Sequence, residues 1–185
     1  MEKIQKLISG PNKLTLFRIA VIPIIIILLL FPNSICTFIA AILFSAAAIT
    51  DYLDGFYARK RGLVTTLGKV MDPVADKLLV SSAFIMLSSL GWVPAWMACI
   101  IIGRELAVTG LRNIIAQKGE DISASNLGKY KTGFQIAAII PLMIHYPFFG
   151  LNVQIIGALF LWAALAFTIW SGTDYFVRSR RFLGE

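Results

Sequence analysis

The chain has 185 residues, of which 58% are hydrophobic, and a formal net charge of +7. This length is too short for several soluble domains, and this composition is too apolar for an ordinary soluble one. The basic residues flank apolar runs and no RNA- or DNA-binding motif is present, so we predict contact with anionic membrane lipids and no nucleic acid partner. Cys36 and Cys99 lie within apolar segments without metal-like spacing and are expected to be buried.

Residues 1–11 are expected to form a short amphipathic segment on the membrane surface, because Ile4, Leu7 and Ile8 share one helical face. Residues 12–185 are expected to form a six-helix transmembrane domain with a basic C-terminal tail. Turn residues separate the apolar runs and place the six helices at about 14–31, 35–61, 67–90, 95–116, 129–146 and 153–176. The predicted fold class is therefore an all-α integral membrane protein.

The orientation of these helices follows from the 17 Lys and Arg residues. They lie in the two termini, in or beside the loops after the second and fourth helices, and in the membrane segments next to those loops, whereas the turns around Pro32, Trp92 and Phe149 contain none. Basic loops stay in the cytoplasm, so we predict six membrane spans with both termini and both basic loops on the cytoplasmic side.

Four aspartates interrupt the apolar pattern in two pairs, Asp51 with Asp54 and Asp72 with Asp76. Residues three or four apart share one face of a helix, so two neighbouring helices would bring four carboxylates together. Four uncompensated charges in a bilayer would cost on the order of 10 kcal/mol. Ion pairing with Lys69 and the nearby basic cluster accounts for part of this charge. Two divalent cations, Mg²⁺ or Mn²⁺, account for it better, because hard carboxylate oxygens are the ligands they select.

The spacing of these acids and of the small residues between them forms the pattern D-x2-D-G-x2-A-R-x8-G-x3-D-x3-D. This pattern resembles the signature of the CDP-alcohol phosphatidyltransferases, and no position of that signature is missing. The resemblance implies that CDP-diacylglycerol is the donor and that metals are bound by the four aspartates, with Asp76 also acting as the catalytic base. It further implies a nucleotide pocket, which would contain Asp51, Asp54, Gly55, Ala58, Arg59 and Gly68.

Four basic residues fall near the cytoplasmic half of the fourth and fifth helices: Arg104, Arg112, Lys129 and Lys131. Intramembrane cations need a counter-charge, which could be Glu105 or the aspartates for Arg104, or the phosphate of an anionic acceptor for the group. The stretches GPNKLTLFRIAVIP, GRELAVTGLR and LGKYKT also resemble those of bacterial phosphatidylglycerophosphate synthases. That resemblance implies sn-glycerol 3-phosphate as the acceptor, phosphatidylglycerophosphate and CMP as products, and a homodimer.

Two alternatives stay open at this point. The acceptor could be inositol phosphate, serine or phosphatidylglycerol, or the acids could belong to a small cation transporter, because intramembrane carboxylates also mark ion pathways. We expect direct displacement at phosphorus without a covalent histidine intermediate, because the only histidine, His145, falls near the far end of the fifth helix. Asp174 is expected to pair with Arg178 one turn further on and to have no catalytic role.

Overall fold

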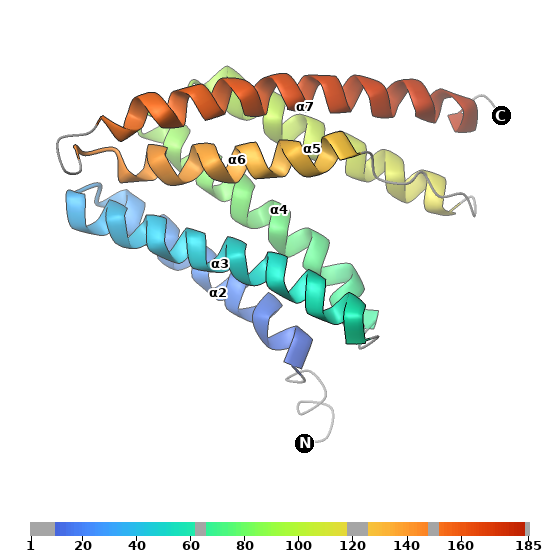
Figure 1. The fold of residues 1–185 in the computed structure, drawn as a ribbon, viewed down its shortest axis with the longest axis horizontal. Helices are drawn as coiled ribbons and strands as arrows, with labels where there is room; N and C mark the ends of the chain where they lie inside the picture. The colour runs from blue at the N-terminus through green and yellow to red at the C-terminus, as the bar shows by residue number, and fades with distance from the viewer. Residues whose placement is uncertain (1–9, 62–65, 118–125, 148–151, 184–185) are drawn as a thin grey trace.

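The computed structural model describes residues 10–61, 66–117, 126–147 and 152–183. Within these ranges, the side chains of residues 10–15, 51–61, 66–73, 126–127, 129 and 182–183 are not described. The described part is helical throughout and contains no strand (Figure 1). Its helices are α2 (Gly10–Leu30), α3 (Ser34–Arg61), α4 (Thr66–Ser89), α5 (Ala95–Gln117), α6 (Asn126–Ile144) and α7 (Val153–Leu183).

The helices pack as two antiparallel hairpins with α4 and α5 completing the bundle. α6 packs along α7, and α2 packs along α3, while α4 contacts α2, α5 and α6. The hairpins lie closest where the turns after α2 and α6 meet, through α3 and α6, and their axes diverge toward the opposite end (Figure 1). α3 also contacts α4, so the two helices that carry the predicted aspartates are neighbours.

Local signals explain the ends of these helices. The side-chain oxygen of Asn33 accepts hydrogen bonds from the backbone N–H groups of Ile35 at 3.1 Å and Cys36 at 2.9 Å, which caps the start of α3. Gly91 follows α4 with a φ of +74°, a backbone conformation that glycine adopts without steric cost. The expected turns at these two places are confirmed.

Two predicted boundaries are wrong. α2 already begins at Gly10 instead of about residue 14, because Pro11 is tolerated in the first turn of a helix, where its missing N–H is not needed. α7 continues through the basic tail to Leu183 instead of ending near residue 176, and the ion pair between Asp174 and Arg178 spans one of the added turns. Residues 1–9, which make up most of the predicted amphipathic segment, lie outside the described part.

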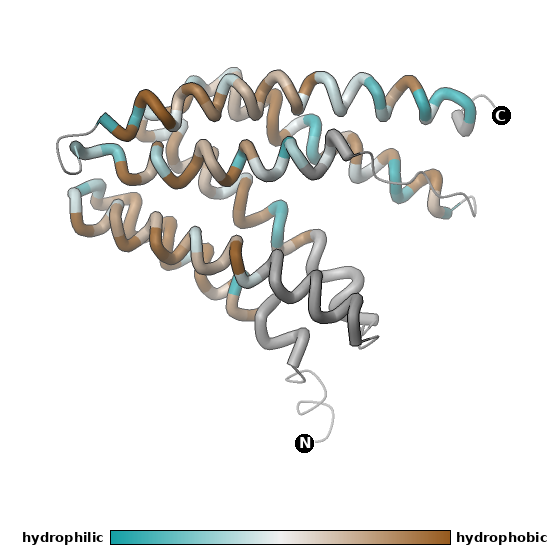
Figure 2. Tube along the Cα trace, in the orientation of Figure 1, coloured by the Kyte–Doolittle hydropathy of each residue, from teal (hydrophilic) through white to brown (hydrophobic). Residues whose placement is uncertain are grey.

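The larger of two apolar clusters in the described part contains side chains from all six of these helices. It is centred on Leu29, Phe44, Phe84, Ile101, Met143 and Leu165. The outer surface is also apolar, with Leu30, Ile35 and Leu159 each more than half exposed (Figure 2). Exposed apolar surface of this extent indicates a membrane or interaction surface. The expectation that both cysteines are buried is wrong, because Cys99 lies on this apolar exterior and Cys36 is half-buried.

Length and hydropathy identify one helix of the described part, over Val153–Arg181, as able to cross a membrane. The other apolar stretches are shorter, and among them are Leu16–Leu30, Ser34–Thr50 and Tyr130–Ile144. Each of these three stretches borders residues whose side chains are not described. The all-helical class is therefore confirmed, whereas the prediction of six spans stays a prediction.

Candidate active site

The predicted acidic motif divides between two neighbouring helices. α3 carries Asp51 and Asp54, together with Gly55, Ala58 and Arg59, and α4 carries Gly68, Asp72 and Asp76. The side chains at these positions lie outside the described part, except that of Asp76, which is half-buried. Among the described side chains, no three His, Cys, Asp or Glu residues are grouped closely enough to hold a metal.

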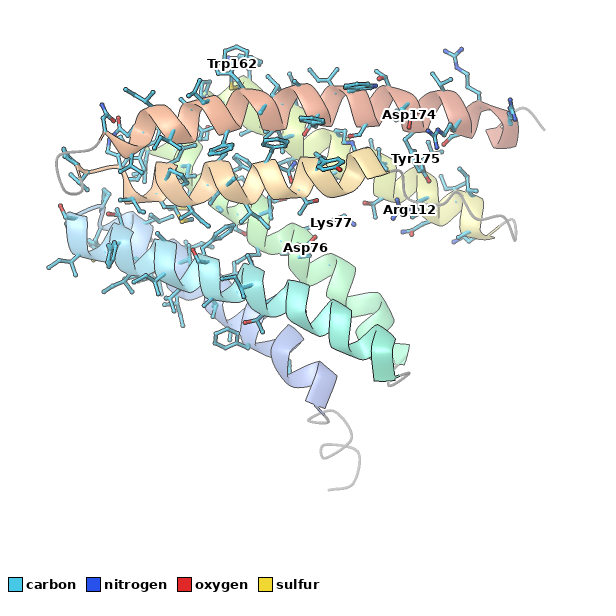
Figure 3. All side chains as sticks on the ribbon, in the orientation of Figure 1. Asp76, Lys77, Arg112, Trp162, Asp174 and Tyr175 are labelled. Carbon is cyan, nitrogen blue, oxygen red and sulfur yellow. The ribbon has the colours of Figure 1, made fainter. Side chains whose placement is uncertain are left out.

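A narrow pocket opens beside Asp76, between α4, α5 and α6. Apolar side chains form part of its wall, and polar and charged groups from three helices form the rest. Its lining residues are Asp76, Lys77, Val80, Ser81, Ile101, Ile102, Glu105, Thr132 and Gln135. Figure 3 shows Asp76 and Lys77 on α4 where this helix passes α6. A carboxylate, an ammonium group and neutral hydrogen-bonding groups therefore meet in one place.

Glu105 on α5 is the ionic centre next to this pocket. Its Oε1 atom contacts Nζ of Lys131 on α6 and lies 3.2 Å from Nη1 of Arg104. The Lys131 side chain is only 5% exposed, and those of Glu105 and Arg104 are each 14% exposed. The Glu105 carboxylate thus forms ion pairs with two cations, and the three charged groups together have a net charge of one positive unit.

Arg104 connects this ionic group to α7. Its Nη2 atom donates a 3.0 Å hydrogen bond to Oγ of Ser171. Gly172 makes room for the arginine, because a Cβ atom there would lie 3.1 Å from Cγ of Arg104. Nearby, Nε2 of Gln135 lies 3.5 Å from Oγ1 of Thr168, and both residues are buried. These bonds hold α5, α6 and α7 together around polar groups.

The other predicted acceptor-binding residues lie further along the same end. Arg112 is exposed, and its guanidinium carbon lies 5.7 Å from the ring centre of Tyr175 (Figure 3). The Tyr175 hydroxyl is buried and has no hydrogen-bond partner in the described part of the chain. The side chain of Lys129 lies outside the described residues. Nε of Arg178 donates a 3.0 Å hydrogen bond to Oδ1 of Asp174, which confirms the predicted ion pair.

His145 lies at the opposite end of the bundle, directly after α6. Its ring stacks on Trp92 at a centroid distance of 3.9 Å, and its Nδ1 atom lies 2.7 Å from Nε2 of Gln154. The residue adopts a φ of 28°, which is uncommon for a side chain other than glycine. These contacts agree with a packing role for His145. The residue does not line the pocket beside Asp76.

Several polar residues of the site were not singled out from the sequence. Thr132 and Gln135 on α6, and Thr168 and Ser171 on α7, each stand three residues apart in otherwise apolar stretches. That spacing places each pair on one face of its helix, and it is the sequence signal from which a polar site on these faces could have been predicted. Ser81 and Lys77 carry the same signal at a spacing of four residues on α4.

Comparison with known proteins identifies the family of this chain. The sequence model of the family described as CDP-alcohol phosphatidyltransferase matches residues 9–170. A Bacillus subtilis protein named CDP-diacylglycerol–glycerol-3-phosphate 3-phosphatidyltransferase is 46% identical over 181 residues, which cover 91% of this chain and 94% of the relative. Proteins of the same name from Rickettsia typhi and Shigella flexneri serotype 5b are 42% and 34% identical, over 90% and 92% of this chain and 94% of each relative. The chain therefore belongs to the CDP-alcohol phosphatidyltransferase family.

Proposed function

We propose that this chain transfers the phosphatidyl group of CDP-diacylglycerol to sn-glycerol 3-phosphate, which gives phosphatidylglycerophosphate and CMP. The observation that carries this proposal is the likeness to relatives named for this reaction, which extends over about nine tenths of the chain. The full set of signature residues between Asp51 and Asp76 supports it, because these residues are the ones that the chemistry requires. The transporter alternative has no comparable support.

The aspartates fit a site for divalent cations, on which the family generally depends. Asp51 and Asp54 on one helix and Asp72 and Asp76 on its neighbour form an all-oxygen, anionic donor set, the kind that Mg²⁺ or Mn²⁺ prefers. We propose that these four residues hold two such cations and that Gly55, Ala58, Arg59 and Gly68 shape the nucleotide pocket. Bound cations would polarise the phosphoryl group and neutralise the leaving phosphate.

The chain's own groups then accomplish the proton transfer and the orientation of the substrates. An acceptor hydroxyl attacks the phosphorus that bears the diacylglycerol, and its proton passes to the Asp76 carboxylate. A new P–O bond forms to the acceptor as the P–O bond to CMP breaks, so CMP leaves with the electron pair. Asp76 suits this role because its half-buried carboxylate lines the pocket that would receive the hydroxyl.

An anionic acceptor is favoured by the positive charge around this pocket. Arg104, Arg112, Lys129 and Lys131 all belong to α5 and α6, at the end of the bundle that carries the charged residues. We propose that they attract and bind the acceptor phosphate, since guanidinium and ammonium groups form strong charge-assisted hydrogen bonds with phosphate oxygens. Serine lacks a phosphate and would not use this charge.

The membrane arrangement belongs to the same proposal. We place six helices across the inner membrane, with the charged end of the bundle at the cytoplasmic face, because a soluble acceptor must reach a site that also receives a lipid. The exposed apolar exterior supports this placement, as does the lack of Lys and Arg in the turns around Pro32, Trp92 and Phe149. We also propose a homodimer, as the family resemblance implies.

A panel of acceptors tests the proposed reaction. Purified protein in detergent with CDP-diacylglycerol and Mg²⁺ is expected to release CMP with glycerol 3-phosphate, and much more slowly with inositol phosphate, serine or phosphatidylglycerol. Asp76→Asn is expected to keep the fold and lower kcat by roughly a hundredfold or more, since a general base contributes about 10²–10⁴-fold. Asp174→Asn is the matched control. Preferred use of another acceptor, or an active Asp76→Asn variant, would contradict the corresponding part of the proposal.

A further inference from the structure

Glu105 lies in a position that its sequence context does not reveal. Its carboxylate lines the pocket beside Asp76, and the same carboxylate contacts Lys131 from α6 and Arg104 from its own helix. Among the charged side chains described on α5 and α6, Glu105 is the only anion. Glu105 is therefore the carboxylate that contacts both buried cations next to the pocket, and Asp76 on α4 is a second carboxylate in the pocket lining.

Burial increases the need of these cations for a counter-charge. Lys131 is 4% exposed, so its ammonium group has lost most of its hydration and needs an anionic partner to remain charged inside the bundle. Removing one member of a buried ion pair leaves the other charge uncompensated, which is far more disruptive than losing an exposed pair. Arg104 is fixed from two sides, by Glu105 and by Ser171.

We infer that Glu105 is a positioning residue for the acceptor. It holds Lys131 and Arg104 at the edge of the pocket, charged and oriented, so that an anionic acceptor is received with its hydroxyl near Asp76. The positive charge left over from two cations and one carboxylate attracts the acceptor, while the ion pairs fix where that charge lies. This inference rests on the proposed function, and it assigns to Glu105 a role that acts through Lys131.

Electrostatic repulsion alone predicts the opposite effect. A carboxylate near a phosphate site repels the phosphate, so by repulsion alone the removal of Glu105 would strengthen acceptor binding. Burial decides between the two effects, because a Lys131 without its partner would either lose its proton or turn away from the pocket. We therefore expect weaker acceptor binding when the carboxylate is lost, and the sign of the change tests the inference.

The experiment measures CMP release with saturating CDP-diacylglycerol, Mg²⁺ and varied glycerol 3-phosphate. Glu105→Gln is expected to raise the acceptor KM by roughly tenfold or more, the size seen when one partner of a buried charge pair is lost. The KM for CDP-diacylglycerol should stay within about twofold, because the effect is confined to acceptor binding. Glu105→Asp keeps the charge and is expected to restore part of the acceptor KM. Asp174→Asn, which removes a carboxylate from an ion pair with an exposed arginine, is the control.

A double-variant comparison tests whether Glu105 acts through Lys131. In a Lys131→Met background, Glu105→Gln should change the acceptor KM by less than about twofold, since the partner is already gone. If the two substitutions changed the acceptor KM independently of each other, the inference would be overturned. A lower acceptor KM in Glu105→Gln would also overturn it, and so would a fall in the kcat of that variant with both KM values unchanged. If Glu105→Gln does not fold, Glu105→Asp gives the same readout through a selective rise in the acceptor KM. An inactive wild-type protein would refute the proposed function as well, whereas an unchanged variant KM would refute only this inference.

Discussion

A close contact between α6 and α7 at Gly157 gives a stability prediction that can be worked out from distances. A Cβ atom added at Gly157 would lie 2.7 Å from Cγ of Leu142, 3.0 Å from its Cδ2 and 3.1 Å from its backbone nitrogen. The leucine side chain cannot relieve all three contacts, because its backbone is fixed in α6 by the helix. Gly157→Ala should therefore push the two helices apart. Overpacking of this kind costs about 1–3 kcal/mol, and the replacement of glycine by alanine in a helix returns up to about 1 kcal/mol.

The expected net loss for Gly157→Ala is thus about 1–2 kcal/mol, which corresponds to a Tm lower by roughly 2–8 °C for a chain of this size. Thermal unfolding in one detergent measures this change. Gly133→Ala on α6 is the matched control, since a Cβ there would meet nothing within 4 Å, and its Tm should be unchanged or higher. A Tm for Gly157→Ala equal to or above that of the wild type would refute the packing argument.

Three further predictions concern the site and the opposite end of the bundle. Chelation of divalent cations should abolish CMP release, and added Mg²⁺ or Mn²⁺ should restore it; full turnover in metal-free buffer would contradict the metal site. Arg112→Ala should raise the acceptor KM by roughly tenfold. Arg112→Lys keeps the positive charge and should raise the KM less, as expected for a charge that binds phosphate. Equal effects of both variants would indicate that the stacking of Arg112 on Tyr175 matters instead. Burial lowers the pKa of His145 from 6.5, so the unfolded chain binds a proton at this residue at a higher pH than the folded chain does. The contribution of His145 to the free energy of unfolding should therefore be constant above about pH 6.5 and should fall as the pH drops below that value. The Tm of His145→Asn should fall less between pH 7 and 5 than that of the wild type, and parallel losses would contradict this assignment.

The parts of the fold that the sequence predicted are those set by local patterns. Apolar runs separated by turn residues located the helices, and Asn33 and Gly91 mark two of the turns correctly. The predicted end of α7 is wrong because charged residues after an apolar run predict a tail, whereas a pair such as Asp174 with Arg178 is compatible with a continuing helix. The number of spans was not established, because length and hydropathy identify one spanning helix in the described part of the chain.

In the candidate site, too, residues close in sequence could be predicted to lie together, whereas contacts between different helices could not. The aspartate pairs were recognisable because their spacing lies within single helices, and a possible partner for Arg104 was its neighbour Glu105. The contact of Glu105 with Lys131 joins residues 26 positions apart, and that of Arg104 with Ser171 joins residues 67 apart. Such contacts depend on how α5, α6 and α7 rotate against each other, which the pattern of each helix alone does not determine.

The two ends of the bundle are built for different tasks. At the end that carries the turns after α2, α4 and α6, the described side chains include no Lys, Arg, Asp or Glu, and neutral contacts join the turns: Tyr146 donates a hydrogen bond to the carbonyl oxygen of Pro32, and His145 stacks on Trp92. Toward the other end the hairpin axes diverge, and the acidic and basic residues lie on these diverging segments (Figure 1). A core joined firmly at its neutral end lets the charged end keep polar groups that only ligands and mutual pairing can satisfy. The described charged side chains and the turns that are joined by neutral contacts thus lie in opposite halves of the bundle.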